Sequence, residues 1–319
     1  MISAIESLEG YKILVTGSSG FIGRALVKGL LERGASVVGV DLRPCSEPVP
    51  GAVPEAAYRF VHGPFSGVEG EAARALGRSP GRPVAVFHMA GMVNARSCNM
   101  DPQRAFETNV ALTMTALEFC RRNNVERFVF PSTGLVYGDG LGRPATEGDP
   151  AVARDVYTAT KLASEQMIRG YASSYGLAAV TARLSNVYGP GSPPDTVAGA
   201  ILKQVREGGD VVLRDLSPVR DFIHIEDVAD GLIALLVSMN GPGCRIVNLS
   251  TGVGTSVRGL AESICRAASV PLKRIRSAAS RPRRISSLVL DNSLLVQRTG
   301  WRPRYLLNGD AQSTTEMCC

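Results

Sequence analysis

The sequence lacks the features that mark metal-binding, membrane-spanning and nucleic-acid-binding proteins. No apolar run approaches the ~20 residues of a membrane span, and Glu6 and Glu9 precede the first apolar run, unlike a signal peptide. Aromatic residues make up only 6% of the chain and do not alternate with basic clusters, so nothing predicts a nucleic-acid partner. We therefore expect a cytoplasmic protein that binds neither membranes nor nucleic acid.

The cysteines also argue against a metal or disulfide framework. Their number is odd and their spacing is not that of a metal site, which favours reduced thiols and predicts no metal. The adjacent pair at the C-terminus is interpreted as part of a frayed tail, with metal ligation or oxidation as the alternative. The seven are Cys45, Cys98, Cys120, Cys244, Cys265, Cys318 and Cys319.

What the chain does contain is typical of a globular α/β protein. Its 319 residues, 45% hydrophobic and 20% charged, suit one large domain or two unequal ones. Apolar strands alternate with helical stretches, a pattern that predicts a Rossmann-type, doubly wound parallel sheet. Strands are expected at 11–17, 36–41, 83–91, 127–133 and 178–186, and helices at 21–34, about 102–123 and about 156–175.

The pattern loosens after residue 186 and indicates a second, smaller α/β lobe. The segment "NVYGPGSPPD" (186–195) is rich in Gly and Pro and is predicted to be a loop. We expect a nucleotide-binding domain over 11–186 and a mainly substrate-binding lobe over 187–317, with segments at about 220–250 returning to the first domain. Helices after the loop are expected at about 196–208, 226–239 and 255–268.

A glycine-rich loop, "LVTGSSGFIG" (14–23), lies between the first strand and the first helix. Gly17 would allow the turn, Gly20 a close approach of the backbone to a pyrophosphate, and Gly23 close packing of helix on strand. The helix start would then offer free N–H groups to phosphates. A plain tight turn is the alternative. The following strand ends in Asp41, whose carboxylate suits the adenosine ribose of NAD and would repel the 2′-phosphate of NADP, although Arg43 weakens that choice.

A tyrosine and a lysine stand four positions apart in "VYTATK" (156–161) and would share a helix face. A nearby ammonium and a positive nicotinamide would both favour the phenolate of Tyr157. Thr133, which ends the strand "FVFPST", would donate a hydrogen bond to the substrate oxygen. The trio Thr133, Tyr157 and Lys161 then predicts general acid–base catalysis of alcohol oxidation and ketone reduction. The alternative is a half-buried tyrosine beside a solvated lysine.

Motifs along the chain resemble those of the extended short-chain dehydrogenase/reductases. They stand in the order "TGSSGFIG", "HMAG", "STGLVYG", "YTATK", "RLSNVYGPG", "RDFIHIEDVADGL" and "TGWRP". The chain is similar to the NAD-dependent epimerase/dehydratase branch, which includes UDP-galactose 4-epimerase. The resemblance covers residues 11 to about 317 and implies NAD as cofactor, a nucleotide-diphosphate sugar as substrate, and a homodimer formed through the helices near 102–123 and 156–175.

The resemblance also implies the roles of individual residues. The implied cofactor-binding residues are Gly17, Gly20, Phe21, Ile22, Gly23, Asp41, Leu42, Arg43, Met89, Ala90, Gly91, Met92, Asn109, Tyr157, Lys161, Ser185 and Val187. The implied substrate-facing residues are Ser132, Thr133, Asn186, Arg220 and Arg281. Two arginines and an amide suit a diphosphate. The alternatives are an ion pair of Arg220 with Asp221 or Asp227 and a solvated loop for Arg281.

Departures from the family pattern narrow the expected reaction. Leu135 stands where the sugar 4,6-dehydratases and uronate decarboxylases carry an acid, so a dehydratase is disfavoured. Pro64, Arg283-Arg284 and "RDLSPVR" (214–220) replace residues that contact adenine or the substrate nucleotide, so the nucleotide is left open. We expect an NAD-dependent nucleotide-sugar 4-epimerase. The alternatives are a sugar or alcohol dehydrogenase or ketoreductase of the same family and an inactive NAD-binding scaffold.

Overall fold

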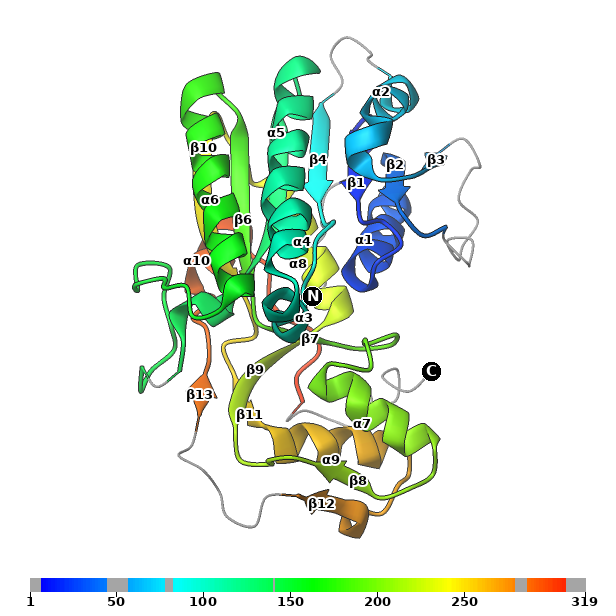
Figure 1. Cartoon of the computed structure of the whole chain (residues 1–319), viewed down its shortest axis with the longest axis vertical. Helices are drawn as coiled ribbons and strands as arrows, with labels where there is room; N and C mark the ends of the chain where they lie inside the picture. The colour runs from blue at the N-terminus through cyan, green and yellow to red at the C-terminus, as the bar shows by residue number, and fades with distance from the viewer. Residues whose placement is uncertain (1–6, 45–56, 78–82, 140, 279–285, 308–319) are drawn as a thin grey trace.

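A seven-stranded parallel sheet forms the centre of the larger domain (Figure 1). The computed structural model describes residues 7–44, 57–77, 83–139, 141–278 and 286–307. The strand order is β10-β6-β5-β4-β1-β2-β3, which confirms the predicted Rossmann-type α/β fold. The strands are β1 (Lys12–Thr16), β2 (Ser36–Asp41), β3 (Tyr58–His62), β4 (Val84–His88), β5 (Arg127–Thr133), β6 (Ala178–Leu184) and β10 (Gly243–Leu249).

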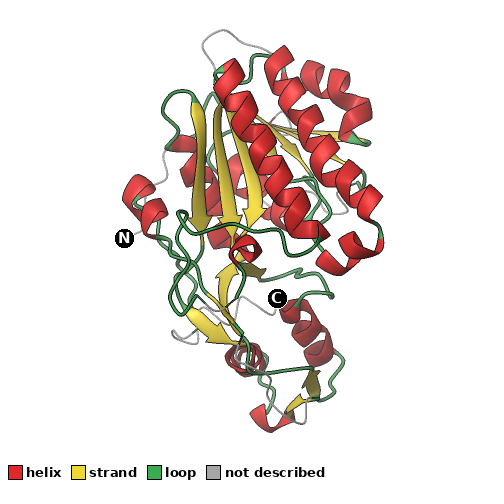
Figure 2. Cartoon of the chain, turned by 60° about the vertical axis from the view of Figure 1, so that its left-hand side comes forward, coloured by secondary structure: helices red, strands yellow, loops and turns green. Residues whose placement is uncertain are grey.

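Helices cover both faces of this sheet (Figures 1 and 2). Successive residues of β1 belong to opposite cores, because side chains of a strand alternate between faces: Ile13 and Val15 join one cluster and Leu14 the other. One face carries α1 (Phe21–Glu32), α8 (Ile225–Val237) and α10 (Ser293–Thr299). The other face carries α2 (Phe65–Leu76), α5 (Leu112–Arg122) and α6 (Val156–Tyr175).

A smaller lobe lies beyond the carboxyl ends of the strands and has a core of its own (Figure 1). Its helices α7 (Val197–Arg206) and α9 (Val257–Ala267) pack together beside a short parallel pair, β8 (Val211–Leu213) and β12 (Ile275–Ser277). A second small sheet connects it to the larger domain. Its strands are β7 (Asn186–Tyr188), β9 (Val219–His224), β11 (Gly254–Ser256) and β13 (Ser287–Leu288).

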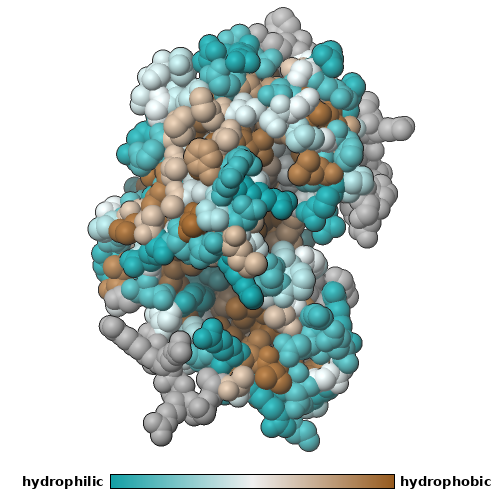
Figure 3. All heavy atoms as spheres, viewed as in Figure 1, coloured by the Kyte–Doolittle hydropathy of each residue, from teal (hydrophilic) through white to brown (hydrophobic). Residues whose placement is uncertain are grey.

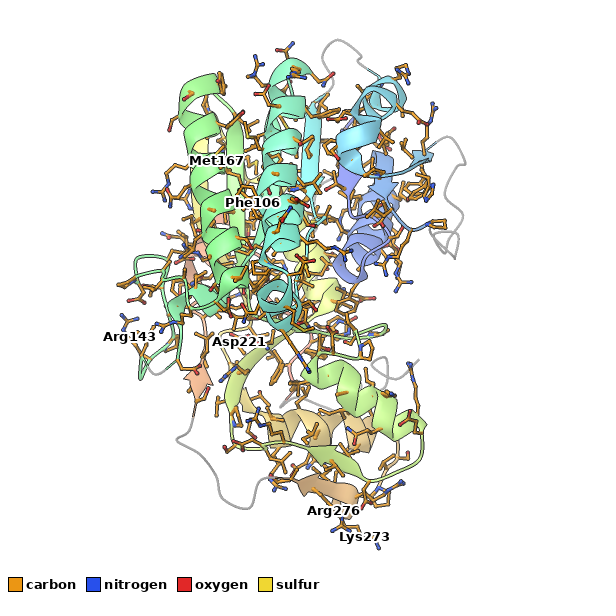
Figure 4. All side chains as sticks on the ribbon, viewed as in Figure 1. Phe106, Arg143, Met167, Asp221, Lys273 and Arg276 are labelled. Carbon is orange, nitrogen blue, oxygen red and sulfur yellow. The ribbon has the colours of Figure 1, made fainter. Side chains whose placement is uncertain are left out.

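Asp221 fixes the junction between the two parts, where Figure 4 labels it. Its buried carboxylate on β9 accepts hydrogen bonds from the backbone N–H groups of Thr251 and Gly252, 3.0 and 2.9 Å away, in the turn after β10. The buried acid is tolerated because several donors satisfy it. It therefore joins the small sheet to a strand of the large one.

The sequence predicted two segments incorrectly. Residues 102–123 do not form one regular helix: α4 (Pro102–Phe106) and α5 are joined by the π-helical turn η2 (Glu107–Ala111). The expected loop 186–195 begins as a strand, because the backbone of β7 pairs with β9. Three further short helices complete the described residues: α3 (Ala95–Met100), η3 (Gly134–Tyr137) and η4 (Leu272–Arg274).

The described residues contain no helix that is both long and apolar enough to span a bilayer. Over the same residues no group of three or more His, Cys, Asp or Glu side chains is arranged to hold a metal ion. The four cysteines in the described part of the chain are free thiols, at Cys98, Cys120, Cys244 and Cys265. Cys45, Cys318 and Cys319 lie outside the described residues.

Candidate active site

The turn between β1 and α1 contains three glycines, and two of them leave no room for a side chain. Gly17 has a φ of +70°, and a Cβ there would stand 2.6 Å from the backbone nitrogen of Ala90. A Cβ at Gly23 would stand 2.0 Å from the carbonyl oxygen of Gly17. The glycines therefore bring the ends of β1 and β4 and the first turn of α1 together, at the point of the sheet where such folds bind nucleotides.

The backbone N–H groups at the start of α1 can donate hydrogen bonds to a ligand, because no side chain of the first turn accepts from them. Gly20 caps the helix without a side-chain hydrogen bond, and no acidic residue occupies the first turn, which begins with Phe21 and Ile22. The hydroxyls of Ser18 and Ser19 are buried beside it and have no hydrogen-bond partner among the described residues. Free N–H groups at a helix start together with unsatisfied hydroxyls fit the phosphates of a dinucleotide.

Asp41 ends β2 and reaches back to the glycine loop. One carboxylate oxygen accepts from the backbone N–H of Ser19 at 3.0 Å, and the other accepts from that of Arg43 at 2.9 Å. Each oxygen keeps a second lone pair for a ribose hydroxyl, so the residue fits the predicted role. Leu42 and Arg43 extend into solvent beyond it; Leu42 is 65% exposed.

Asn109 braces the loop that follows β4. It lies in the π-helical turn η2, and its amide accepts from the N–H of Met92 at 2.6 Å and donates to the carbonyl of the same residue at 2.9 Å. A further hydrogen bond of 2.9 Å joins it to Thr160 on α6. The loop begins with Met89, whose N–H donates to Thr16 of β1. Met89 through Met92 are thereby held between β1 and α6.

A pocket opens beside this loop where β5, β6 and α6 meet. It joins two of the predicted catalytic residues, Thr133 and Tyr157, with two residues assigned by resemblance, Ser185 and Asn186. Of the apolar remainder of its wall the sequence singled out only Leu135, because the other side chains come from segments far apart in the chain. The remaining lining residues are Val93, Gly134, Leu135, Leu184, Leu288 and Leu290.

Tyr157 lies in the first turn of α6, which Asp155 caps in a capping box with Thr158. The side chain is buried among α3 and α4, against Cys98 and Ala105. Burial raises its pKa above the ordinary value of 10.0, and the hydrogen bond with Thr133 lowers it. The Lys161 ammonium, which was expected to lower this pKa, is directed to the carbonyl of Pro131 instead.

Lys161 is buried rather than solvated, so the alternative of a surface lysine does not apply. Its ammonium donates to the carbonyl of Pro131 at 2.9 Å and stands 4.5 Å from the ring centroid of Phe130. Burial lowers the pKa of Lys161 to about 8, against the attraction of Glu165, which raises it. A Cβ at Gly91 would lie 3.9 Å from the same nitrogen, so Lys161 reaches the loop of the nucleotide crevice.

Ser132 does not face the pocket. Its hydroxyl donates to Glu165 on α6 at 2.5 Å, and Glu165 is paired in turn with Arg183 on β6 at 2.7 Å. All three side chains are buried. Sequence reasoning missed Glu165, although its position four residues after Lys161 places it on the same helix face.

Of the two predicted substrate arginines, Arg220 is described by the structure and does not line the pocket. Arg220 donates to the hydroxyl of Ser286 at 2.6 Å and stands 3.5 Å from Asp139, so its ion pair is with neither Asp221 nor Asp227. Arg281 lies outside the described residues, as do Arg283 and Arg284. Val187, on β7, packs against the core on the α1 face of the large sheet.

Comparisons with known proteins identify the family of this chain. The chain matches the model of the NAD dependent epimerase/dehydratase family over residues 13–250. It is 31% identical over 317 residues to a UDP-glucose 4-epimerase of Mycolicibacterium smegmatis, covering 96% of this chain and 97% of the relative.

Two solved structures show the same fold over nearly the whole chain. One is the UDP-glucose 4-epimerase of Thermus thermophilus in complex with NAD, with 32% identity, a TM-score of 0.81 and coverage of 96% and 97% of the two chains. The other is DesIV, a dTDP-glucose 4,6-dehydratase of Streptomyces venezuelae with NAD and TYD bound, with 26% identity, a TM-score of 0.81 and coverage of 96% and 95%.

Proposed function

The chain belongs to the NAD-dependent epimerase/dehydratase family, and we propose that within it the protein is a nucleotide-sugar 4-epimerase. The observation that carries the proposal is the meeting of Thr133 and Tyr157 in one pocket, next to the crevice that the glycine loop and Gly91 form. Lys161 connects the two regions through its position beside Gly91. A proton-transfer group and a dinucleotide crevice are thus adjacent.

NAD fits the crevice through features of this chain. The helix start and the Ser18 and Ser19 hydroxyls would meet the pyrophosphate, and Asp41 would bond the adenosine ribose. Asn109 holds the surrounding loop, and Lys161 lies beside Gly91 within it. When bound, NAD supplies the acceptor and donor of a hydride, and its positive ring favours the phenolate of Tyr157.

The chain's own residues would handle the proton. The Tyr157 oxygen takes the proton of the C4 hydroxyl as the alcohol is oxidised to a 4-keto sugar, and returns it when the ketone is reduced from the opposite face. Thr133 lines the same pocket, and its hydrogen bond lowers the pKa of that oxygen against the effect of burial. The apolar wall of Leu184, Leu288 and Leu290 restricts water around the keto sugar.

The pocket wall disfavours the dehydratase reaction carried out by other members of the family. Elimination of a hydroxyl requires an acid to protonate the leaving group. Leu135 lines the pocket at the position where the dehydratases carry that acid, and its side chain has no proton to give. Among the described residues, no Asp, Glu or His lines this pocket.

The substrate is proposed to be a nucleoside-diphosphate sugar, held between the sheet and the smaller lobe. Asn186 lines the pocket and provides an amide beside the reacting sugar. Arg220, on the strand paired with β7, is the nearby guanidinium proposed to meet the diphosphate, and it would exchange its contact with Asp139 for a phosphate. The relatives' substrates support the class but not the particular sugar or base.

The test uses purified protein without added cofactor. UDP-, dTDP- and GDP-sugars are incubated with the enzyme, and the epimers are separated chromatographically. We expect one pair of epimers to interconvert, and we expect about one NAD per protein chain to appear in the supernatant after denaturation. Net formation of reduced cofactor from added NAD, with none retained by the protein, would instead identify a dehydrogenase and overturn the proposal.

We also propose a homodimer formed through α5 and α6. On this face Phe106 is 55% exposed, Met114 is 48% exposed and Tyr175 is 57% exposed. Figure 4 labels Phe106 and Met167 on this side of the molecule, and Figure 3 shows apolar side chains among polar ones over the same helices. Two such faces would pack as a four-helix bundle across a two-fold axis.

Sedimentation tests the dimer and should give twice the chain mass of 33.8 kDa. Met114→Glu should shift the sedimenting species to the monomer. A monomeric wild type would contradict the proposal.

A further inference from the structure

The end of β5 is attached to α6 at three consecutive positions. The partners on α6 are spaced by four residues, so they lie on one face of the helix. The contacts are the Pro131 carbonyl with Lys161 at 2.9 Å, the Ser132 hydroxyl with Glu165 at 2.5 Å, and the Thr133 hydroxyl with Tyr157. The contacts of Lys161 and of Tyr157 involve members of the proposed catalytic trio. The contact between Ser132 and Glu165 involves two residues that do not line the pocket.

Glu165 is the centre of this third contact. Its two oxygens accept from the guanidinium of Arg183 at 3.1 and 2.7 Å, and only 2% of the residue is exposed. Arg183 is the residue of β6 that stands opposite Ser132 in the sheet and also donates to the Tyr137 hydroxyl at 3.0 Å. A buried acid with every partner in place holds β5, β6 and α6 in one arrangement.

We propose that Glu165 is a positioning residue of this active site: through Ser132 it fixes the strand end that carries Thr133, and it places a carboxylate one helical turn from Lys161 on the same face of α6. The inference rests on the proposed function for its kinetic consequence only. Neither Glu165 nor Ser132 lines the pocket, so any effect on turnover would act through Thr133 and Lys161. Its physical consequence is measurable without substrate or cofactor.

Few other groups offset the charge of Lys161. Tyr157 on the same helix is protonated because burial raises its pKa, and burial likewise raises the pKa of Cys98 on α3. Burial and the Lys161 charge lower the pKa of His88 on β4 to about 3, so the imidazole is neutral. Glu165, one helical turn after Lys161, is the carboxylate whose charge raises the pKa of Lys161 against the effect of burial. Its removal lowers the pKa of Lys161 from about 8 and also leaves the Arg183 cation unpaired, which acts in the same direction.

The direct test is the titration of Lys161 by NMR. The chain has only five lysines, at positions 12, 28, 161, 203 and 273, so [ε-¹³C]lysine labelling gives few signals. The signal lost in Lys161→Met assigns the residue. In Glu165→Gln we expect the titration to move to lower pH by at least about half a unit. An unchanged titration in a folded Glu165→Gln protein would overturn the proposal.

Two further variants separate charge from packing. Ser132→Ala removes the hydroxyl contact but keeps the anion, so the Lys161 titration should stay within about 0.2 of a unit of wild type. Glu165→Gln with Arg183→Gln removes both charges, and the titration should lie between those of wild type and Glu165→Gln. This double variant also keeps the test available if the single variant fails to fold, because no buried charge is left unpaired. Equal titrations in all four proteins would exclude the electrostatic role.

The kinetic arm follows turnover against pH. If the ammonium is required, kcat falls as pH rises through the pKa of Lys161, since the charged form exists below it. The fall should begin at lower pH in Glu165→Gln by the same shift that NMR measures, while Ser132→Ala should lower kcat at all pH values without moving the profile. If the NMR shift is found but the wild type has no epimerase activity, the proposed function is rejected and the inference stands. If the wild type is an epimerase but the pH profiles of kcat coincide for wild type and Glu165→Gln, the inference alone is rejected.

Discussion

At the scale of single residues, the Tyr157 oxygen is the atom on which the proposed reaction depends. In Tyr157→Phe we expect kcat to fall by about 10²–10⁴-fold, because the general acid–base group is lost. NAD should still be retained, since the helix start of α1 and Asp41, which would hold its pyrophosphate and adenosine ribose, are unchanged. Tyr175→Phe is the matched control on the same helix, because that side chain is 57% exposed and distant from the pocket. Turnover that survives in Tyr157→Phe would contradict the assignment.

The sequence predicted which side chains meet but not how each one is engaged. The spacing of Tyr157 and Lys161 and the strand end at Thr133 were sufficient to place two of the three in one pocket. The hydrogen bond of Ser132 to Glu165 was not predictable, because it also depends on Arg183 from another strand. The pKa of Tyr157 was expected to fall beside an ammonium, but the dominant effect is burial, which no local spacing discloses.

At the scale of elements, the glycine turn after β1 is the part most sensitive to a single methyl group. Gly17→Ala should abolish NAD retention, because the new Cβ would meet the backbone of Ala90 at 2.6 Å and the φ of +70° disfavours alanine. The measurement is the NAD released on denaturation, with thermal unfolding recorded in parallel. Gly170→Ala is the control: it lies within α6 with no atom within 4 Å of the added Cβ, so it should stabilise the protein by about 0.5–1 kcal/mol. Full NAD retention in Gly17→Ala would contradict the role of the turn.

The regular helices and strands could be predicted from the local sequence pattern, whereas the irregular segments could not. The predicted spans of β2, β5 and α6 coincide with the observed ones, because buried periodicity and clear end signals define them. The π-helical turn η2 was missed, since the side chain of Asn109 bonds Met92 in the loop after β4 and Thr160 on α6, both of which are distant in the sequence or unmarked by any local pattern. β7 was predicted as loop because its neighbours are Gly and Pro, while its pairing with β9 depends on chain 30 or more residues away.

At the scale of the whole molecule, the segment between β7 and α7 connects the two sides of the nucleotide crevice. At one end the Arg24 guanidinium of α1 fills the space beside Gly191, 3.2 Å from where a Cβ would stand. At the other end Asp195 accepts a hydrogen bond from the side chain of Asn94, two residues after Met92. Ser192 and Thr196 hold the segment through hydrogen bonds to Gly189 and Pro193, which gives it a defined shape.

Because this segment reaches from the start of α1 to the loop after β4, it should slow the departure of a bound dinucleotide. Asp195→Ala removes one partly solvated hydrogen bond of about 1 kcal/mol, and we expect NAD to leave about fivefold faster. Asp195→Asn, which keeps an acceptor oxygen, should release NAD at a rate near that of wild type.

The measurement is the rate at which radiolabelled NAD, already bound, exchanges with unlabelled NAD. Asp210→Ala, which breaks the ion pairs with Arg274 and Arg276 on the smaller lobe, is the control and should leave the rate unchanged. Equal exchange rates in Asp195→Ala and Asp210→Ala would show that retention depends on the glycine turn and Asp41 alone, and that the segment does not close the crevice.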